Sequence, residues 1–129
     1  MGCDIHIEVE RQRPDGTWEN LKPWRKDATF REGYAHFWYR HYALFAFLAQ
    51  VRGEGPTPPR GTPADVSPET HKEHFEWGDD FHSKTWYDAL ELCRSDALLA
   101  INADFYDFVC ECQERARGSR VRLIIAFDN

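Results

Sequence analysis

The first ten residues constrain the fold more than any other stretch, because apolar and polar side chains alternate along them without a break. The two sets are Ile5, Ile7 and Val9 on one side, and Asp4, His6, Glu8 and Glu10 on the other. A repeat of two residues is typical of a β-strand with one buried face. The sequence therefore predicts an amino-terminal strand whose polar face presents Asp4 beside His6.

The last ten residues carry the same two-residue repeat. Apolar side chains alternate here as well: Val121, Leu123, Ile125 and Phe127. If the first and last strands pair antiparallel, the start of one lies opposite the end of the other. Asp4 and His6 then meet the polar pair Asp128–Asn129. Parallel pairing would separate them by roughly 25 Å, at about 3.3 Å per residue, so the pairing direction decides whether these residues form a site.

Turn and helix signals follow the first strand. Pro14–Gly16 is a strong turn signal, so Thr17–Asn20 is predicted to return as the second arm of a β-hairpin. Tyr34–Arg52 is aromatic and apolar on nearly every side, which predicts a buried central helix. Gly53 is the residue expected to end that helix.

Two shorter helices are predicted after a loop of glycines and prolines over residues 53–68. Ser67 is the expected cap of a helix that runs to about Glu76. Ser83 or Thr85 is the expected cap of the next helix, which runs to Cys93.

The remaining signals complete an α+β fold. Ser95 or Asp96 begins a short apolar turn, and the amphipathic segment Ala103–Arg117 predicts a last helix that Gly118 ends. We therefore expect one domain over residues 1–129. Its small antiparallel sheet combines the amino-terminal hairpin with the carboxyl-terminal strand, and three or four helices pack against it.

The amino-acid composition limits the kinds of ligand that the protein is expected to bind. The formal net charge is −6, and a uniformly acidic chain lacks the basic footprint that a nucleic-acid polymer requires. Aromatic residues make up 15% of the chain, more than a minimal core needs, so we expect them to line a pocket or a homo-oligomer interface. The longest apolar run, Tyr42–Ala49, is too short to span a membrane. We expect a cytoplasmic protein.

Cysteine usage agrees with a reducing compartment. The four cysteines are Cys3, Cys93, Cys110 and Cys112, and we expect all of them to be reduced thiols. Cys110 and Cys112 lack the spacing of a zinc knuckle, so structural zinc is not expected. If Cys3 faces inward with Ile5 and Ile7, it serves as a small apolar side chain.

Two chemical interpretations compete for the polar face of the first strand. Asp4, His6 and Asp128, with His82 as a further candidate, are ligands that suit a divalent metal such as zinc or manganese. The alternative is a solvated strand face with a hydrogen bond between histidine and aspartate.

His6 and His82 also suggest acid–base catalysis. Two such groups with a cation, Lys84 or Arg60, suffice to cleave a phosphodiester by attack of a ribose hydroxyl. The alternative is that His82 only orders its own loop.

The irregular segments hold candidate ligand-binding residues. Arg52 and Arg60 bracket the loop of glycines and prolines, and guanidinium groups suit phosphates. Trp77 and Trp86 offer surfaces on which a base can stack. Each residue alone has an ordinary structural explanation as a solvated arginine or a core aromatic.

Five segments spread over most of the chain form a distinctive combination: Met1–His6, Leu44–Gly53, Arg60–Ser67, Asp80–Trp86 and Phe127–Asn129. Together they resemble a group of small uncharacterised bacteriophage proteins. The resemblance implies a phage or prophage origin and expression in the cytoplasm of a bacterial host, and it implies no activity and no residue roles. Small phage accessory proteins often counter host defences, some of them by capturing or cleaving nucleotide immune signals.

We therefore expect a phage accessory protein with an anti-defence role that binds and sequesters a small phosphorylated nucleotide. The expected ligand-binding residues are Asp4, His6, Arg52, Arg60, Trp77, His82, Trp86 and Asp128. One alternative is a phosphodiesterase that cleaves a cyclic nucleotide with His6 and His82 or with a bound metal. The other is a protein–protein inhibitor or a virion component.

Overall fold

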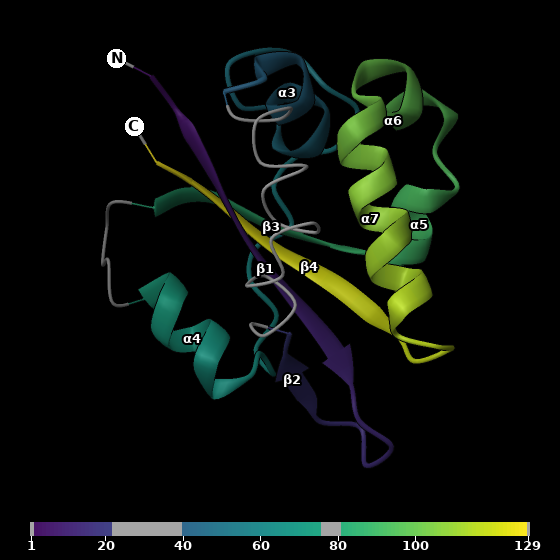
Figure 1. Cartoon of the computed structure of the whole chain (residues 1–129). Coiled ribbons are helices and arrows are strands. Elements are labelled where there is room, and N and C mark those ends of the chain that lie inside the picture. Colours follow the sequence, from purple (N-terminus) through teal and green to yellow (C-terminus); the bar gives the residue numbers. More distant parts are fainter. Residues whose placement is uncertain (1, 22–39, 76–80, 129) are drawn as a thin grey trace.

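A four-stranded antiparallel sheet forms the centre of the protein (Figure 1). The structure is a computed structural model, and it describes residues 2–21, 40–75 and 81–128. The strands lie in the order β2-β1-β4-β3, so the first and last strands of the sequence are neighbours. Their bounds are β1 Asp4–Gln12, β2 Trp18–Asn20, β3 Phe81–Asp88 and β4 Val121–Asp128.

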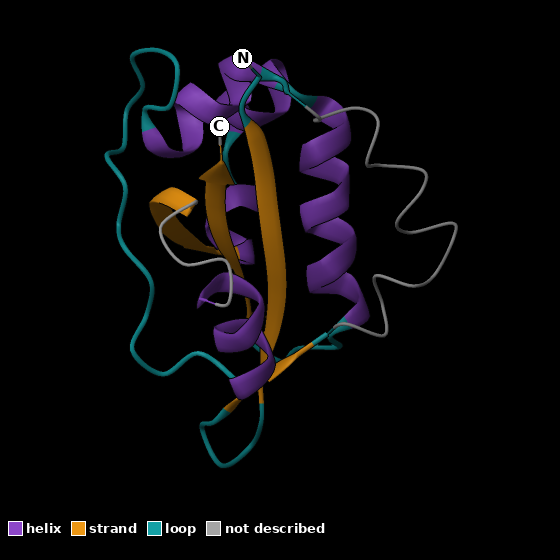
Figure 2. Cartoon of the chain, turned by 90° about the vertical axis from the view of Figure 1, so that its left-hand side faces the viewer, coloured by secondary structure: helices purple, strands orange, loops and turns teal. Residues whose placement is uncertain are grey.

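Five helices surround the sheet within the described ranges. They are α3 Tyr42–Ala49, α4 Pro68–Phe75, α5 Ala89–Cys93, α6 Asp96–Ile101 and α7 Ala103–Arg115. Helices α5 to α7 lie together on one side of the strands, and α4 lies apart from them (Figures 1 and 2). The predicted α+β class is therefore confirmed, and the described residues alone contain five helices where the sequence predicts three or four.

The first and last strands pair antiparallel from Asp4 to Arg11 of β1, which is the whole of β4. Asp4 lies opposite Asp128, His6 opposite Ala126, and Arg11 opposite Val121. The two chain ends consequently lie side by side, as both ribbon views show (Figures 1 and 2). This pairing confirms the condition on which the predicted site depended.

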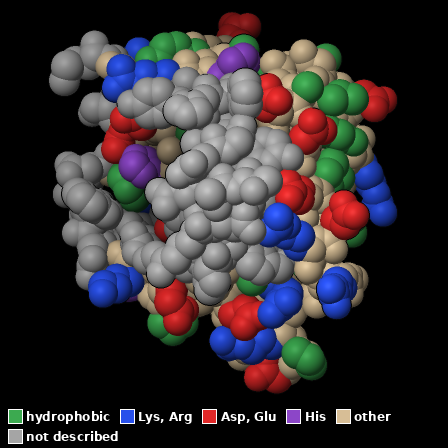
Figure 3. Space-filling model, viewed as in Figure 1, with side chains coloured by type: hydrophobic (Ala, Val, Ile, Leu, Met, Phe, Trp, Pro, Cys, Tyr) green, Lys and Arg blue, Asp and Glu red, His purple; other side chains and the backbone are tan. Residues whose placement is uncertain are grey.

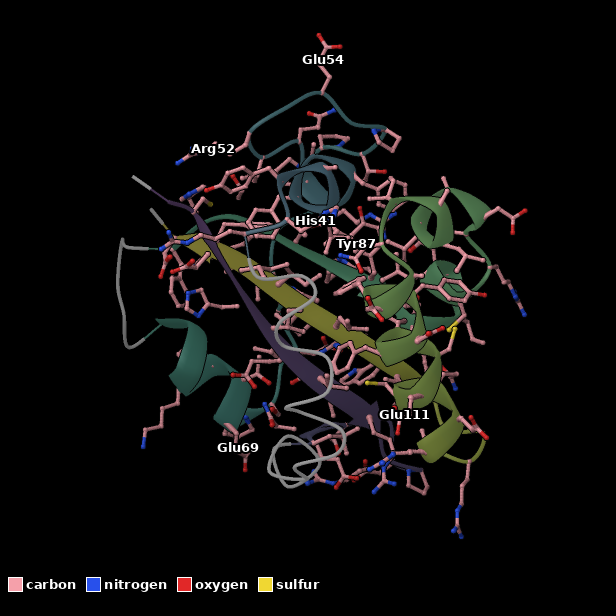
Figure 4. The ribbon with its side chains drawn as sticks, turned by 45° about the horizontal axis from the view of Figure 1, so that its top comes forward. His41, Arg52, Glu54, Glu69, Tyr87 and Glu111 are labelled. Carbon is pink, nitrogen blue, oxygen red and sulfur yellow. The ribbon has the colours of Figure 1, made fainter. Side chains whose placement is uncertain are left out.

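One face of the sheet forms the main hydrophobic core. In this register, alternate residues of β1, β4 and β3 share a face, and those on the core face include Val9, Leu123, Ile125, Phe127 and Tyr87. The ring of Phe127 packs against Phe45 of α3, with ring centroids 5.1 Å apart. Figure 4 shows Tyr87 in the interior between the sheet and the helices, where its hydroxyl donates to the Leu48 carbonyl at 2.5 Å.

The predicted central helix is shorter than expected. Residues 34–39 of the predicted helix lie outside the described ranges, and α3 covers only Tyr42–Ala49. His41 caps its start, because its Nδ1 accepts a hydrogen bond from the Leu44 amide at 3.2 Å. Gln50, rather than Gly53, ends it in a left-handed conformation with φ 57°. The run of apolar residues thus correctly predicts that the helix is buried, but it does not predict where the helix begins and ends.

The predicted helix beginning at Ser83 or Thr85 is wrong, because Phe81–Asp88 is strand β3. Ser83 and Lys84 together oppose the single residue Ala126, so β3 contains a β-bulge. Ser83 has φ 51° there. This extra residue interrupts the alternation of apolar and polar side chains, so the sequence pattern does not predict a strand here. The helix that follows, α5, begins only at Ala89.

The other local predictions are confirmed with small changes of boundary. Ser67 Oγ accepts from the Thr70 amide at the start of α4, and Ser95 Oγ accepts from the Leu98 amide at the start of α6. The Pro14–Gly16 turn closes the hairpin between β1 and β2.

The second face of the sheet carries a buried polar layer. Glu10 is fully buried and Arg122 is 4% exposed. Arg122 Nε donates to Glu10 Oε1 at 2.8 Å, and its guanidinium lies 3.8 Å from the centre of the Trp18 ring. The second carboxylate oxygen of Glu10 accepts from the Ser67 amide at 2.7 Å. One ion pair therefore joins β1 and β4 to β2 and to the start of α4.

We predict that Glu10→Ala lowers the free energy of unfolding by about 3–5 kcal/mol, because it leaves the Arg122 guanidinium buried without its main partner. Urea unfolding followed by circular dichroism measures this loss.

The matched control is Arg11→Ala on the same strand. Arg11 pairs with Glu19 where both side chains are partly exposed, 36% and 26%, so its loss should cost no more than about 1 kcal/mol. Equal costs for the two variants would show that the buried pair does not carry this stability.

Candidate functional site

The polar ends of β1 and β4 meet at one end of the sheet. Asp4 and Asp128 are direct partners in the register, and His6 Nε2 lies 2.7 Å from Asp128 Oδ2. The His6 side chain is 42% exposed and that of Asp128 is 33% exposed. A carboxylate and an imidazole from opposite ends of the chain thus form a hydrogen-bonded pair that solvent can reach.

Arg40 completes a second pair at the same end. Its Nε donates to Asp4 Oδ1 at 2.8 Å. Arg40 has φ 53°, a conformation that is costly for any residue except glycine. A Cβ atom added to Gly2 would lie 2.3 Å from the Arg40 guanidinium carbon. The absence of a side chain at Gly2 therefore makes room for the guanidinium beside Asp4.

Phe81 adds an aromatic surface from β3. Its ring stacks on His6, with centroids 4.5 Å apart and planes inclined by 30°. The two residues belong to strands on either side of β4, and β4 places only the methyl group of Ala126 opposite His6. We define the terminal site as Asp4, His6, Arg40, Phe81 and Asp128. Figure 3 shows basic, acidic and histidine side chains close together near the chain ends, at its upper left.

Arg52 and Tyr42 adjoin the terminal site through Cys3. The Cys3 amide donates to the Tyr42 hydroxyl at 3.2 Å, and the Arg52 guanidinium carbon lies 5.3 Å from the centre of the Tyr42 ring. Figure 4 shows Arg52 reaching outward from the segment after α3, on the side where β1 begins. A second guanidinium group therefore lies beside the terminal site.

The Cys3 thiol is not a nucleophile in this setting. Its side chain is fully buried, and burial is the main cause of a raised thiol pKa. The charges of Asp128 and Asp4 also raise the pKa, whereas Arg52 and Arg40 lower it. Only the thiolate attacks electrophiles, so Cys3 acts as an apolar residue, as predicted.

His82 does not join His6 on the same face of the sheet. It pairs with Phe127, whose side chain lies in the core, whereas His6 pairs with Ala126 on the opposite face. His82 Nδ1 lies 2.9 Å from Ser83 Oγ. The Nε2 atom is buried and has no hydrogen-bond partner among the described residues. The geometry therefore does not favour His6 and His82 as an acid–base pair.

Arg60 and Trp86 also lie away from the terminal site. The Arg60 guanidinium makes two hydrogen bonds to Glu91, of 2.7 and 2.6 Å, and lies 4.1 Å from the centre of the Tyr87 ring. Trp86 shares the face of His6, but it pairs with Ile124, further along β4. The structure therefore brings neither Arg60 nor Trp86 to the terminal site, and Trp77 lies outside the described residues.

The predicted metal set is only partly assembled. Asp4, His6 and Asp128 are neighbours, but Asp4 pairs with Arg40 and His6 with Asp128. In the part of the chain that the structure describes, no three histidine, cysteine or acidic side chains are arranged to hold a metal ion. The geometry favours a hydrogen-bonding site over a metal centre.

Sequence reasoning missed two members of the terminal site. The apolar run predicts Arg40 in the interior of the long helix, and a histidine cap such as His41 is an uncommon start signal. Phe81 was missed with its strand, although the run Thr85–Tyr87 consists of residues that favour β-strands. That run was the signal that could have identified β3.

Comparisons with family models, with curated proteins and with solved structures find no match to this chain. The geometry of the terminal site is therefore the basis for proposing a function. No helix within the described ranges is long and apolar enough to cross a membrane.

We predict that iodoacetamide leaves Cys3 unmodified in the folded protein at neutral pH and alkylates it in urea, because burial keeps the thiol protonated and inaccessible. Peptide mass mapping measures the modified fraction. Rapid alkylation of Cys3 without denaturant would contradict this account of the site.

Proposed function

We propose that the protein binds a small phosphorylated nucleotide at the terminal site. The proposal rests on the groups that come together at one partly exposed end of the sheet. They are two guanidinium groups, two carboxylates and one stacked imidazole ring: Arg40, Arg52, Asp4, Asp128 and His6. Guanidinium groups suit phosphate oxygens, and carboxylates accept hydrogen bonds from ribose hydroxyls or base amino groups.

The existing ion pair does not block this role. The Arg40 side chain is 47% exposed and that of Asp4 is 29% exposed. Partly exposed ion pairs contribute at most about 1 kcal/mol, because water screens them. A phosphate offers Arg40 two oxygens in the geometry of its guanidinium fork, so exchanging Asp4 for a ligand phosphate costs little.

Sequestration of a nucleotide immune signal is the role we propose in the cell. It rests on the resemblance to phage proteins and on the acidic composition of the chain, which favours a small ligand over a nucleic-acid polymer. Binding without cleavage agrees with the placement of His6 and His82 on opposite faces of the sheet.

The protein-interaction alternative has one feature in its favour. Leu90 of α5 and Leu99 of α6 are 44% and 43% exposed, and the pocket that Leu90 lines is formed mostly by polar and charged side chains, among them Asp88 and Arg120. Isolated exposed apolar residues are common on protein surfaces. Nucleotide binding is therefore the function with the stronger geometric support.

We predict that isothermal titration calorimetry against cyclic nucleotides and ADP-ribose derivatives identifies a ligand for the wild-type protein. Arg40→Ala and Arg52→Ala should each weaken its binding about tenfold or more, which corresponds to about 1.4 kcal/mol. The matched control is Arg13→Ala, an exposed arginine beyond the other end of β1, and it should bind as the wild type does.

Two results would contradict the proposal. One is the absence of binding at about 100 μM across the panel, an affinity near −5.5 kcal/mol. The other is an equal loss of affinity in Arg13→Ala, which would indicate non-specific attraction. Recovery of intact ligand after denaturation separates sequestration from cleavage.

A further inference from the structure

Two partly exposed cysteines lie on helices α5 and α7, and neither belongs to the terminal site. Cys93 is the last residue of α5, and Cys110 lies in the middle of α7. Both are partly accessible to solvent, whereas Cys3 and Cys112 are buried. Sulfur atoms, yellow in Figure 4, lie on the side where α5 meets α7.

Helix geometry orients Cys110 toward Cys93. The core-facing residues of α7 are Phe105, Phe108, Val109 and Cys112. Tyr106 and Cys110 are four residues apart, so they are neighbours on a different face of the same helix. The Tyr106 hydroxyl donates to the Cys93 carbonyl at 2.7 Å. The face that carries Cys110 is therefore held against the end of α5.

The two thiols are neighbours. The Cys110 side chain acts on both groups that α5 and α7 bring beside it, since burial and, after it, Cys110 raise the pKa of the Cys93 thiol, and Cys110 raises the pKa of the Tyr106 hydroxyl. A disulfide needs its two sulfur atoms to approach to about 2 Å. The hydrogen bond from Tyr106 to the Cys93 carbonyl holds the face that carries Cys110 against the end of α5, so the two side chains are placed where such a bond can form.

We propose that Cys93 and Cys110 form a reversible dithiol switch that a small disulfide, such as glutathione disulfide, oxidises to a bond between α5 and α7. The Cys110 thiolate attacks one sulfur of glutathione disulfide and releases one glutathione thiolate. Cys93 then loses its proton to solvent and attacks the Cys110 sulfur, which releases the second glutathione. Two protein thiols are oxidised, and one glutathione disulfide is reduced to two glutathione molecules.

The order of attack follows from the environment of Cys93. Burial is the main cause that raises the pKa of the Cys93 thiol to about 12, and the neighbouring Cys110 side chain adds to it. Cys93 therefore reacts slowly with an external disulfide at neutral pH. Its attack becomes efficient once Cys110 carries glutathione, because the two sulfur atoms are then neighbours within one chain.

The test is oxidation of the full-length protein with glutathione disulfide at mildly alkaline pH, followed by mass spectrometry without reduction. The wild type should lose two hydrogen atoms and yield a peptide linked through Cys93 and Cys110, with no lasting glutathione adduct. Its melting temperature should rise by several degrees and return after reduction, because the bond constrains the unfolded chain. This measurement needs no variant, so it stands even if a substitution impairs folding.

Two serine variants test the mechanism. Cys93→Ser should retain glutathione on Cys110, and Cys110→Ser should retain it on Cys93 at a rate several-fold lower. Stable glutathione adducts on the wild type, a bond between two chains, or a bond that involves Cys3 or Cys112 would overturn the proposal.

Discussion

A single buried ion pair fixes how the ends of the chain meet. Glu10 and Arg122 are direct partners on β1 and β4, and both lie where solvent scarcely reaches. A slip of one residue between these strands would bury unpaired charge and turn the apolar side chains away from the core. The register that places Asp4 opposite Asp128 therefore depends on an interaction six residues away along β1. The pairing of Glu10 with Arg122 near one end of β1 and β4 therefore helps to position the terminal site at their other end.

The parts of the site that the sequence revealed are those built on regular alternation. Ile5 and Ile7 identified the first strand, Leu123 and Ile125 identified the last, and antiparallel pairing followed as one of two options. The sequence places His6 near Asp128 on one condition, that the two strands pair antiparallel, and the structure meets this condition. The two-residue repeat identifies both strands but leaves the direction of their pairing open.

The parts that the sequence hid depend on backbone conformations that break local rules. Arg40 and Ser83 have positive φ angles that pattern analysis does not assign to such residues. The backbone of Arg40, with φ 53°, directs its side chain toward Gly2. The bulge at Ser83 shifts the two-residue alternation of β3, so the sequence pattern does not reveal that strand. Arg60 lies away from the site for another reason. Its guanidinium pairs with Glu91, which is distant in sequence, and no local signal links the two residues.

The meeting of the first and last strands also governs how the protein can be handled. Both chain ends emerge beside the terminal site (Figure 1), so an affinity tag or a fusion partner at either end would lie over the arginines that we expect to bind phosphate. The turn at Pro14–Gly16, at the opposite end of β1, is exposed. An epitope inserted into that turn would leave the terminal site open, and a tag cleaved from either end should restore binding that the tagged protein lacks.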